Sequence, residues 1–184
     1  MMLSLLKINS KILLSLLFKG AFGAAILYRK KDDGLMVIIK VWEKDKTITI
    51  SNKFFPQEIN MLDLSATERQ MALNEVRVLA TLDHPNIVTY YDSFERDGVL
   101  MIEMEYADGG NLAESLAKKT VRMEEKDIVN IFSQIVSAIR HMHDNNVLHR
   151  DLKTANIFLT KENMVKVGDF GISKVGVQMS TMSI

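Results

Sequence analysis

The chain has 184 residues, of which 47% are hydrophobic and 25% are charged, a composition that supports a folded core. Its 23 basic and 23 acidic side chains cancel, which argues against a polycation that binds nucleic acid. The absence of cysteine excludes disulfides and thiolate zinc sites, and it agrees with a reducing compartment such as the cytoplasm.

Residues 1–19 form an atypical basic and apolar segment. Its apolar run, residues 12–18, is interrupted by Ser15 and closed by Lys19, so it is too short to cross a bilayer. A weak secretory signal and a basic amphipathic helix lying on a membrane are two alternatives. A segment that is disordered or packed loosely on the domain is the simpler interpretation, and membrane association is not expected.

The next elements along the chain are strand-like. Residues 28–40 predict a β-hairpin with its turn at residues 31–34. Residues 41–57 are polar at both ends and have a short β-prone centre at residues 47–50. They predict an insertion at the surface of the molecule.

Residues 65–68, Ser-Ala-Thr-Glu, form a capping-box pattern that predicts the start of a helix running to about residue 82. The apolar side chains of this helix recur on one face at Leu73, Val76, Leu79 and Ala80. Pro85 ends the helical pattern. Strands over residues 87–91 and 99–105 are then predicted around an Asp97-Gly98 hairpin turn.

Beyond Gly109-Gly110 the pattern becomes helical. An apolar stripe at helical spacing predicts a helix that packs on the core, with the residues Ile128, Ile131, Phe132, Ile135, Ile139 and Met142. Short strands are predicted at residues 147–148, 157–159 and 165–167. The strand-rich first half and the helix-led second half together predict an α+β fold in two lobes.

Two short segments in the second half carry groups suited to phosphoryl transfer, which needs a positioned nucleotide, metal ions on its phosphates and a carboxylate at the incoming hydroxyl. Asp151 can accept or orient the hydroxyl proton, and Lys153 can direct a cation toward the transferring phosphate. Asn156 and Asp169 offer the oxygen ligands that Mg²⁺ prefers. Each residue alone is a weak signal, but their order and spacing together are highly specific.

The histidines of this region have a simpler interpretation. His149 is expected to be a buried structural histidine without acid–base work. His141 and His143 have no carboxylate or cysteine partners at a metal-binding spacing, so both are interpreted as structural.

The segments HRDLKTANIFL and GDFG resemble the catalytic and metal-binding loops of eukaryotic protein kinases. The resemblance extends through residues 20–40 and 58–174. EINMLDLSATERQMALNEVRVLATLDHPNIVTYYDSF and EMEYADGGNL are most similar to the NIMA-related family of Ser/Thr kinases, in particular to the branch that bears regulator-of-chromosome-condensation repeats. Lys153 also favours the Ser/Thr class over the tyrosine class.

The resemblance implies a two-lobed kinase fold, ATP and Mg²⁺ as cofactors, and proteins with Ser or Thr as substrates. It implies an antiparallel-sheet N-lobe over residues 20–106, interrupted by the insertion 41–57, and a partial helical C-lobe over residues 107–184. No nucleic acid partner is expected. Cytoskeletal or centrosomal association within the cytoplasm is implied by the family alone.

The resemblance also implies roles in the first half of the chain. Lys40, in Val-Ile-Ile-Lys, corresponds to the lysine that binds the α- and β-phosphates, and Glu75 to its ion-pair partner. Without the resemblance, Glu75 is interpreted as a solvated acid on the face of a helix. Leu79, His149 and Phe170 are implied to stack through the core.

The resemblance further implies an adenine site. Met104 corresponds to the residue at the back of that pocket, and the backbone groups of Glu105 and Ala107 to those that hold the adenine edge. Phe158 is implied to pack beneath the base. For these residues an ordinary packing role and the family role nearly coincide.

The glycine-rich loop matches the family only in part. Gly20-Ala-Phe-Gly23 corresponds to its second half, where glycines let backbone amides approach the phosphates. Phe18 stands where the family has its first glycine. The strand expected before the loop is replaced by sequence rich in Lys, Ser and Leu.

Two further departures concern residues 41–57 and the end of the chain. Removing residues 41–57 joins Lys40 to Glu58 in a family-like sequence, which indicates a retained intron or gene-model error, or else a regulatory insertion. Only 13 residues follow Gly171, and none resembles the Ala-Pro-Glu end of an activation segment. The alternative function is therefore an impaired or truncated kinase fragment that binds a nucleotide or a partner.

Overall fold

A computed structural model describes residues 10–20, 23–42, 66–96 and 99–176. The chain divides into two compact units, which are described separately below. The first unit comprises residues 1–73 and 90–106, and the second comprises residues 74–89 and 107–184. The predicted N-lobe included residues 74–89, whereas the structure assigns them to the second unit.

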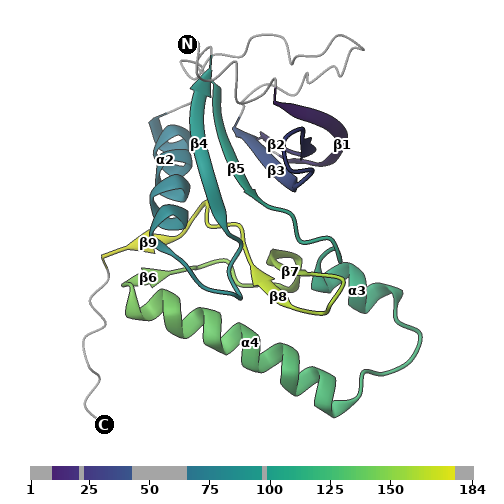
Figure 1. The fold of residues 1–184 in the computed structure, drawn as a ribbon. Helices are drawn as coiled ribbons and strands as arrows, with labels where there is room; N and C mark the ends of the chain where they lie inside the picture. The colour runs from purple at the N-terminus through teal and green to yellow at the C-terminus, as the bar shows by residue number, and fades with distance from the viewer. Residues whose placement is uncertain (1–9, 21–22, 43–65, 97–98, 177–184) are drawn as a thin grey trace. The chain divides into compact units, whose positions relative to one another are not determined.

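The first unit contains an antiparallel sheet of five strands in the order β1-β2-β3-β5-β4 (Figure 1). The strands are β1 (Lys11–Gly20), β2 (Gly23–Lys30), β3 (Met36–Trp42), β4 (Tyr90–Arg96) and β5 (Val99–Glu105). The predicted hairpin is confirmed, because β2 and β3 pair around a turn closed by the Lys30 N–H donating to the Leu35 carbonyl at 2.9 Å. Gly34 takes φ +73° in this turn, a conformation that favours glycine.

Residues 11–19 belong to β1, so the alternatives of a loose segment and of an amphipathic helix are wrong for these residues. β1 pairs with β2 through backbone groups, and the register shifts twice, between Leu13 and Ser15 and between Leu16 and Phe18. Five large apolar side chains of this edge strand are 37–43% exposed, namely Ile12, Leu13, Leu14, Leu16 and Leu17. Strand pairing needs only backbone donors and acceptors, so β1 forms without an alternating pattern of side chains.

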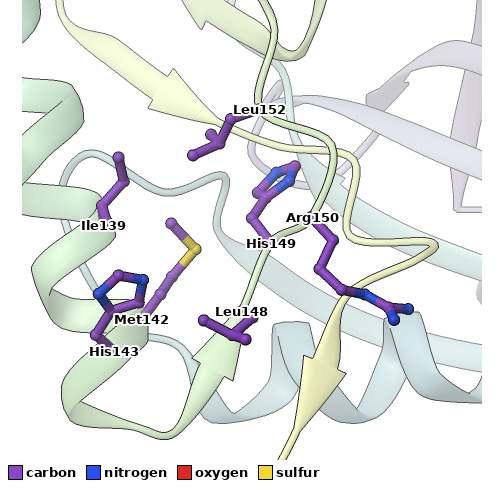
Figure 2. Close-up of a pocket in the computed structure, with 7 residues that line it drawn as sticks. All are labelled: Ile139, Met142, His143, Leu148, His149, Arg150 and Leu152. Atoms are coloured by element: carbon purple, nitrogen blue, oxygen red, sulfur yellow. The ribbon is translucent and has the colours of Figure 1, made fainter. Parts of the chain in front are cut away.

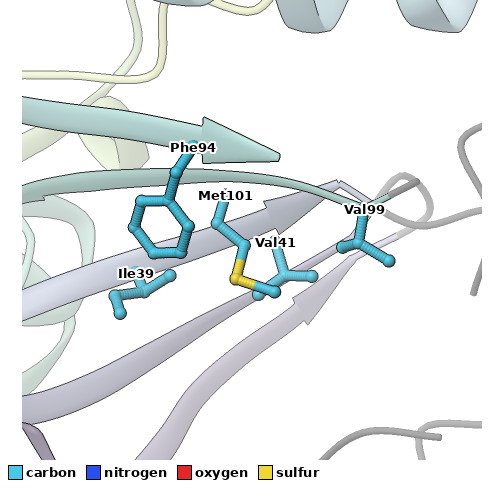
Figure 3. Close-up of a cluster of buried hydrophobic side chains, with 5 residues drawn as sticks. All are labelled: Ile39, Val41, Phe94, Val99 and Met101. Carbon is cyan, nitrogen blue, oxygen red and sulfur yellow. The ribbon is translucent and has the colours of Figure 1, made fainter. Parts of the chain in front are cut away.

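One face of the sheet carries a buried apolar cluster made of Ile39, Val41, Phe94, Val99 and Met101 (Figure 3). Because side chains alternate along a strand, Ile39 and Val41 face this cluster while Lys40 and Trp42 face the other side. Val41 and Trp42 begin the predicted insertion, yet both are buried and complete β3. The β-prone centre predicted at residues 47–50 lies outside the described residues.

A buried group of three charges connects strands that are not neighbours in the sheet. Lys11 Nζ on β1 lies 3.1 Å from Glu103 Oε2 on β5, and Lys30 Nζ on β2 lies 3.0 Å from Glu103 Oε1. β2 and β3 separate β1 from β5 in the strand order, so the sheet curls to bring Lys11 and Glu103 together.

The second unit combines helices with two short antiparallel sheets, β6-β9 and β7-β8. Its elements are α3 (Leu112–Lys118), α4 (Glu125–Asp144), β6 (Val147–Leu148), the 3₁₀ turn η2 (Thr154–Asn156), β7 (Ile157–Leu159), β8 (Val165–Val167) and β9 (Lys174–Val175). The three predicted short strands are confirmed as β6, β7 and β8. Among the residues that the structure describes, no helix combines the length and apolar character needed to cross a membrane.

The strand predicted from residue 87 begins later, at Tyr90. Ile87 instead forms an isolated parallel bridge with Val167, and the Val88 N–H donates to the Val167 carbonyl at 2.9 Å. These bonds tie residues 87–88 to the second unit. The predicted turn at Asp97-Gly98 lies outside the described residues.

Helix α2 (Ala66–Thr81) confirms the helix predicted between residues 65 and 82, although its predicted cap at Ser65 lies outside the described residues. The predicted face is wrong in part, because Leu73 is 46% exposed. The buried positions are Ala72, Glu75, Val78 and Leu79. Beside the apolar Val78 and Leu79, the packed face thus includes a small residue and an acid, which an apolar pattern does not detect.

Helix α4 packs against β6 and β8 (Figure 1), and its Met142 and Ala138 are buried as a core helix requires. The core role predicted for Ile128 and Phe132 is wrong, since these side chains are 53% and 64% exposed. Val129 and Val136 are exposed as well. The described residues therefore leave several apolar side chains of α4 exposed.

Candidate active site

The β7–β8 hairpin brings the two predicted loop segments together. Ile157 pairs with Val167 at the open end of this hairpin. One step further, the Gly168 N–H donates to the Asn156 carbonyl at 3.1 Å. Asn156 immediately precedes β7 and Asp169 follows Gly168, so the pairing register positions both metal-ligand candidates at the same end of the hairpin.

His149 connects the same two loops through both of its ring nitrogens. Its Nε2 donates to the Gly168 carbonyl at 3.0 Å, and its Nδ1 accepts a hydrogen bond from the Asp151 N–H at 3.3 Å. The ring packs against Phe170, with 4.9 Å between the ring centroids. His149 is 4% exposed, which confirms it as a buried structural histidine. Leu79 and Phe170 are buried as well.

The carboxylate of Asp151 is held by two donors on one oxygen. Lys153 Nζ lies 2.7 Å from Asp151 Oδ2, and Asn156 Nδ2 donates to the same oxygen at 3.0 Å. Lys153 is the main cause of a lowered pKa of Asp151, so the carboxylate is ionised at neutral pH. Oδ1 receives no hydrogen bond from the described residues, which leaves one basic oxygen for an incoming proton.

The oxygen ligands at the end of the hairpin fit a magnesium ion. Asn156 is buried, and its Nδ2 donates to both the carbonyl and the carboxylate of Asp151, so its Oδ1 is the atom available to a metal. Asp169 adds an exposed carboxylate from a backbone with φ +63°. Mg²⁺ takes few protein ligands and completes its shell with water and phosphate oxygens. Within the described ranges no group of three or more His, Cys, Asp and Glu side chains could hold a metal ion.

A cavity of about 370 Å³ lies between α4 and residues 148–152 (Figure 2). It is lined by Ile139, Met142, His143, Leu148, His149, Arg150 and Leu152. Figure 2 shows residues of α4 on one side and of the loop on the other. None of the predicted catalytic, metal-binding or nucleotide-binding residues lines it.

Two glycines that were not predicted to be site residues shape the second unit. A Cβ on Gly168 would lie 3.0 Å from both the Phe158 ring and the Val88 side chain. A Cβ on Gly109 would lie 2.7–2.9 Å from backbone atoms of Leu159 and Thr160. The signal for Gly168 was its position directly before Asp169, which connects it to the metal-ligand candidate. Gly109 therefore requires glycine for a close backbone approach, whereas a side chain at position 168 would press on Phe158 and Val88.

The remaining predicted residues of the first unit lie on its sheet. Gly20 and Gly23 are paired at the facing ends of β1 and β2. Lys40 is partly exposed on β3, between Ala25 on β2 and Ile102 on β5. The candidate hinge residues Met104 and Glu105 end β5. Their contacts with a nucleotide stay predictions.

Glu75, Ala107 and Phe158 belong to the second unit. Glu75 is only 1% exposed, so its interpretation as a solvated acid is wrong. A buried carboxylate needs a compensating partner, which agrees with the role that the resemblance implies. The Lys40–Glu75 ion pair stays a prediction.

Burial of His149 sets a pH dependence for stability. Removal from water lowers the pKa of His149 below its ordinary value of about 6.5, and the hydrogen bond to Gly168 offsets only part of this effect. Below pH 6.5 the unfolded chain therefore binds a proton that the folded chain resists, and stability falls as the pH drops. We expect a slope of up to about 1.4 kcal/mol per pH unit from this group.

Urea unfolding at pH values from 8 to 5 tests this expectation. His149→Gln keeps a donor for the Gly168 carbonyl but removes the titrating ring, so its stability should depend less steeply on pH between 6.5 and 5. Parallel curves for the variant and the natural chain would show that His149 titrates normally.

The β7–β8 hairpin thus brings the candidate catalytic residue Asp151 and the candidate metal ligands Asn156 and Asp169 to one end of the second unit. The protein kinase domain family matches residues 13–183, and the chain therefore belongs to the protein kinase family.

Curated relatives agree with the predicted resemblance to NIMA-related kinases. The probable serine/threonine-protein kinase nek3 of Dictyostelium discoideum is 42% identical over 163 residues, covering 85% of this chain and 13% of the relative. Serine/threonine-protein kinase Nek1 of Mus musculus is 42% identical over 158 residues, covering 85% and 12%. Serine/threonine-protein kinase Nek8 of Danio rerio is 43% identical over 164 residues, covering 88% and 21%. The chain thus spans between 12% and 21% of the length of these relatives.

Proposed function

We propose that this chain transfers the γ-phosphoryl group of ATP to serine and threonine hydroxyls of proteins, with Mg²⁺ as cofactor. The observation that carries the proposal is the Asp151 carboxylate, ionised and held on one oxygen by Lys153 and Asn156. Relatives that share 42–43% of the matched residues bear the name serine/threonine-protein kinase, which supports the same chemistry.

In the proposed reaction the substrate hydroxyl oxygen attacks the γ-phosphorus as the bond to the β-phosphate oxygen breaks and ADP leaves. Asp151 orients the hydroxyl and takes its proton on Oδ1. Lys153, whose ammonium is exposed beside this carboxylate, neutralises charge on the transferring phosphate. Mg²⁺ held by Asn156 and Asp169 would screen the phosphate charges.

The family pattern supplies the proposed nucleotide contacts. Lys40, paired with Glu75, would contact the α- and β-phosphates, and the turn carrying Gly20 and Gly23 would cover them. The adenine would meet Met104, Glu105, Ala107 and Phe158. A cytoplasmic location, with cytoskeletal or centrosomal association, is proposed from the family alone.

Phosphate incorporation tests the proposal directly. The purified chain is incubated with γ-labelled ATP and a panel of peptides that differ only in carrying Ser, Thr or Tyr. We expect label on Ser and Thr peptides in the presence of Mg²⁺ and none after chelation. A chain that unfolds cooperatively but transfers no phosphate under these conditions would contradict the proposal.

The exposed apolar residues of α4 favour a second candidate, a module that binds a nucleotide or a protein partner without turnover. Ile128, Val129 and Phe132 are each more than half exposed, which is unusual for a helix packed on one side only. This candidate expects ATP to raise the melting temperature while no phosphate is transferred. Measured turnover would exclude it as the sole function.

A further inference from the structure

Lys40 and Trp42 form a close pair on β3. They are two residues apart on one strand, so their side chains share a face of the sheet. The Lys40 ammonium lies 5.1 Å from the centroid of the Trp42 ring, within the range of a cation–π interaction. Trp42 is 3% exposed, whereas Lys40 is partly exposed. A fixed aromatic surface thus lies beneath a cation that reaches solvent.

We propose that Trp42 is a positioning residue for Lys40. Its ring holds the Lys40 ammonium in the position from which it would contact the nucleotide phosphates. This inference rests on the proposed function, in which Lys40 contacts the α- and β-phosphates. A free lysine side chain has several rotatable bonds, and ordering it on binding costs conformational entropy. A buried indole that restricts the ammonium beforehand removes part of that cost.

The pair is compatible with a bound phosphate. The ammonium has three N–H donors, and only one side of it faces the indole ring. Trp42 is anchored by its place in β3, where its neighbours are Gly23 on β2 and Leu100 on β5. The ring therefore stays in place when a nucleotide arrives, and Lys40 can contact the phosphates without leaving it.

Substitution of Trp42 should therefore change the KM for MgATP. Trp42→Leu keeps a large apolar side chain but removes the aromatic surface, so the KM for MgATP should rise about two- to fivefold with kcat little changed. Trp42→Phe keeps an aromatic ring, so its KM for MgATP should be closer to that of the natural chain. Equal KM values for all three proteins would overturn the inference.

A spectroscopic test needs no turnover, because Trp42 is the only tryptophan in the chain. Lys40→Met removes the cation from the ring and should change the emission of Trp42, whereas Lys40→Arg keeps a cation there and should change it much less. Lys30→Met, which alters a lysine above Tyr91 instead, is the matched control. A merely structural Trp42 would give the same emission in all four proteins, and this result would overturn the inference.

Calorimetric titration with MgATP separates the inference from the proposed function. If the natural chain binds no nucleotide, the proposed function fails, but the emission of the Lys40 variants still decides whether the two side chains are coupled. If nucleotide binds while Trp42→Leu and Trp42→Phe have equal Kd values, the positioning role fails and the proposed function stands. Should Trp42→Leu not fold, the Lys40 variants alone carry the test.

Discussion

Asp151→Asn is expected to lower the rate of phosphate transfer by about 10²–10⁴-fold, the range over which a positioned general base acts. Asparagine preserves the size of the side chain and an oxygen for Lys153 and Asn156. It removes the charge and the basic Oδ1 that would take the hydroxyl proton. Binding of MgATP should change little, because Asp151 is not among the residues proposed to hold the nucleotide.

Single-turnover assays with a fixed peptide measure the rate of phosphate transfer. Calorimetric titration measures the affinity for MgATP separately. Asp108→Asn is the matched control, since Asp108 is also an aspartate of the second unit paired to a lysine, with 3.1 Å between its Oδ2 and Lys161 Nζ. It should retain activity. An Asp151→Asn protein as active as Asp108→Asn would remove Asp151 from the mechanism.

Glu103→Gln is expected to destabilise the first unit by about 3–5 kcal/mol, the range measured when one partner of a buried ion pair is removed. The side chains of Lys11 and Glu103 are both only 4% exposed. The substitution therefore leaves the buried Lys11 ammonium facing a neutral amide. Lys30 is more exposed, at 23%, and can turn toward water.

Urea unfolding of the natural chain and of Glu103→Gln measures the difference in their free energies of unfolding. Glu124→Gln makes the same chemical change in an exposed ion pair, whose Glu124 Oε2 lies 2.8 Å from Lys126 Nζ, and should cost less than about 1 kcal/mol. A double variant, Lys11→Met with Glu103→Met, removes both buried charges and should be more stable than Glu103→Gln alone. Equal losses of stability for Glu103→Gln and Glu124→Gln would show that burial does not increase the cost of breaking the ion pair.

The meeting of the candidate site residues in the second unit could be predicted because it is encoded locally. The loop with Asp151 and Asn156 and the segment with Asp169 are each contiguous, and the short strands between them form a hairpin. The pattern of side chains therefore implied that these groups meet. The hydrogen bonds of Gly168 that hold them together involve backbone atoms, which a side-chain pattern does not reveal.

Contacts between distant segments could not be predicted in the same way. Lys11 and Glu103 meet only because the sheet curls, and nothing near either residue signals the other. The burial of Glu75 and the exposure of Leu73 depend on what surrounds α2, not on its own apolar spacing. Trp42 was interpreted as part of a surface insertion, yet it completes a strand and lies beneath Lys40.

The irregular pairing of β1 has a consequence for how this protein behaves at high concentration. An edge strand with exposed leucines on it is a template on which a second chain can add, the first step of aggregation. The two register shifts divide β1 into regular runs of three, two and three paired residues. Each run is shorter than an ordinary strand of about five or six residues, and the bulges bend the edge between them. The edge that is richest in leucine thus offers no long straight ladder for another strand to extend.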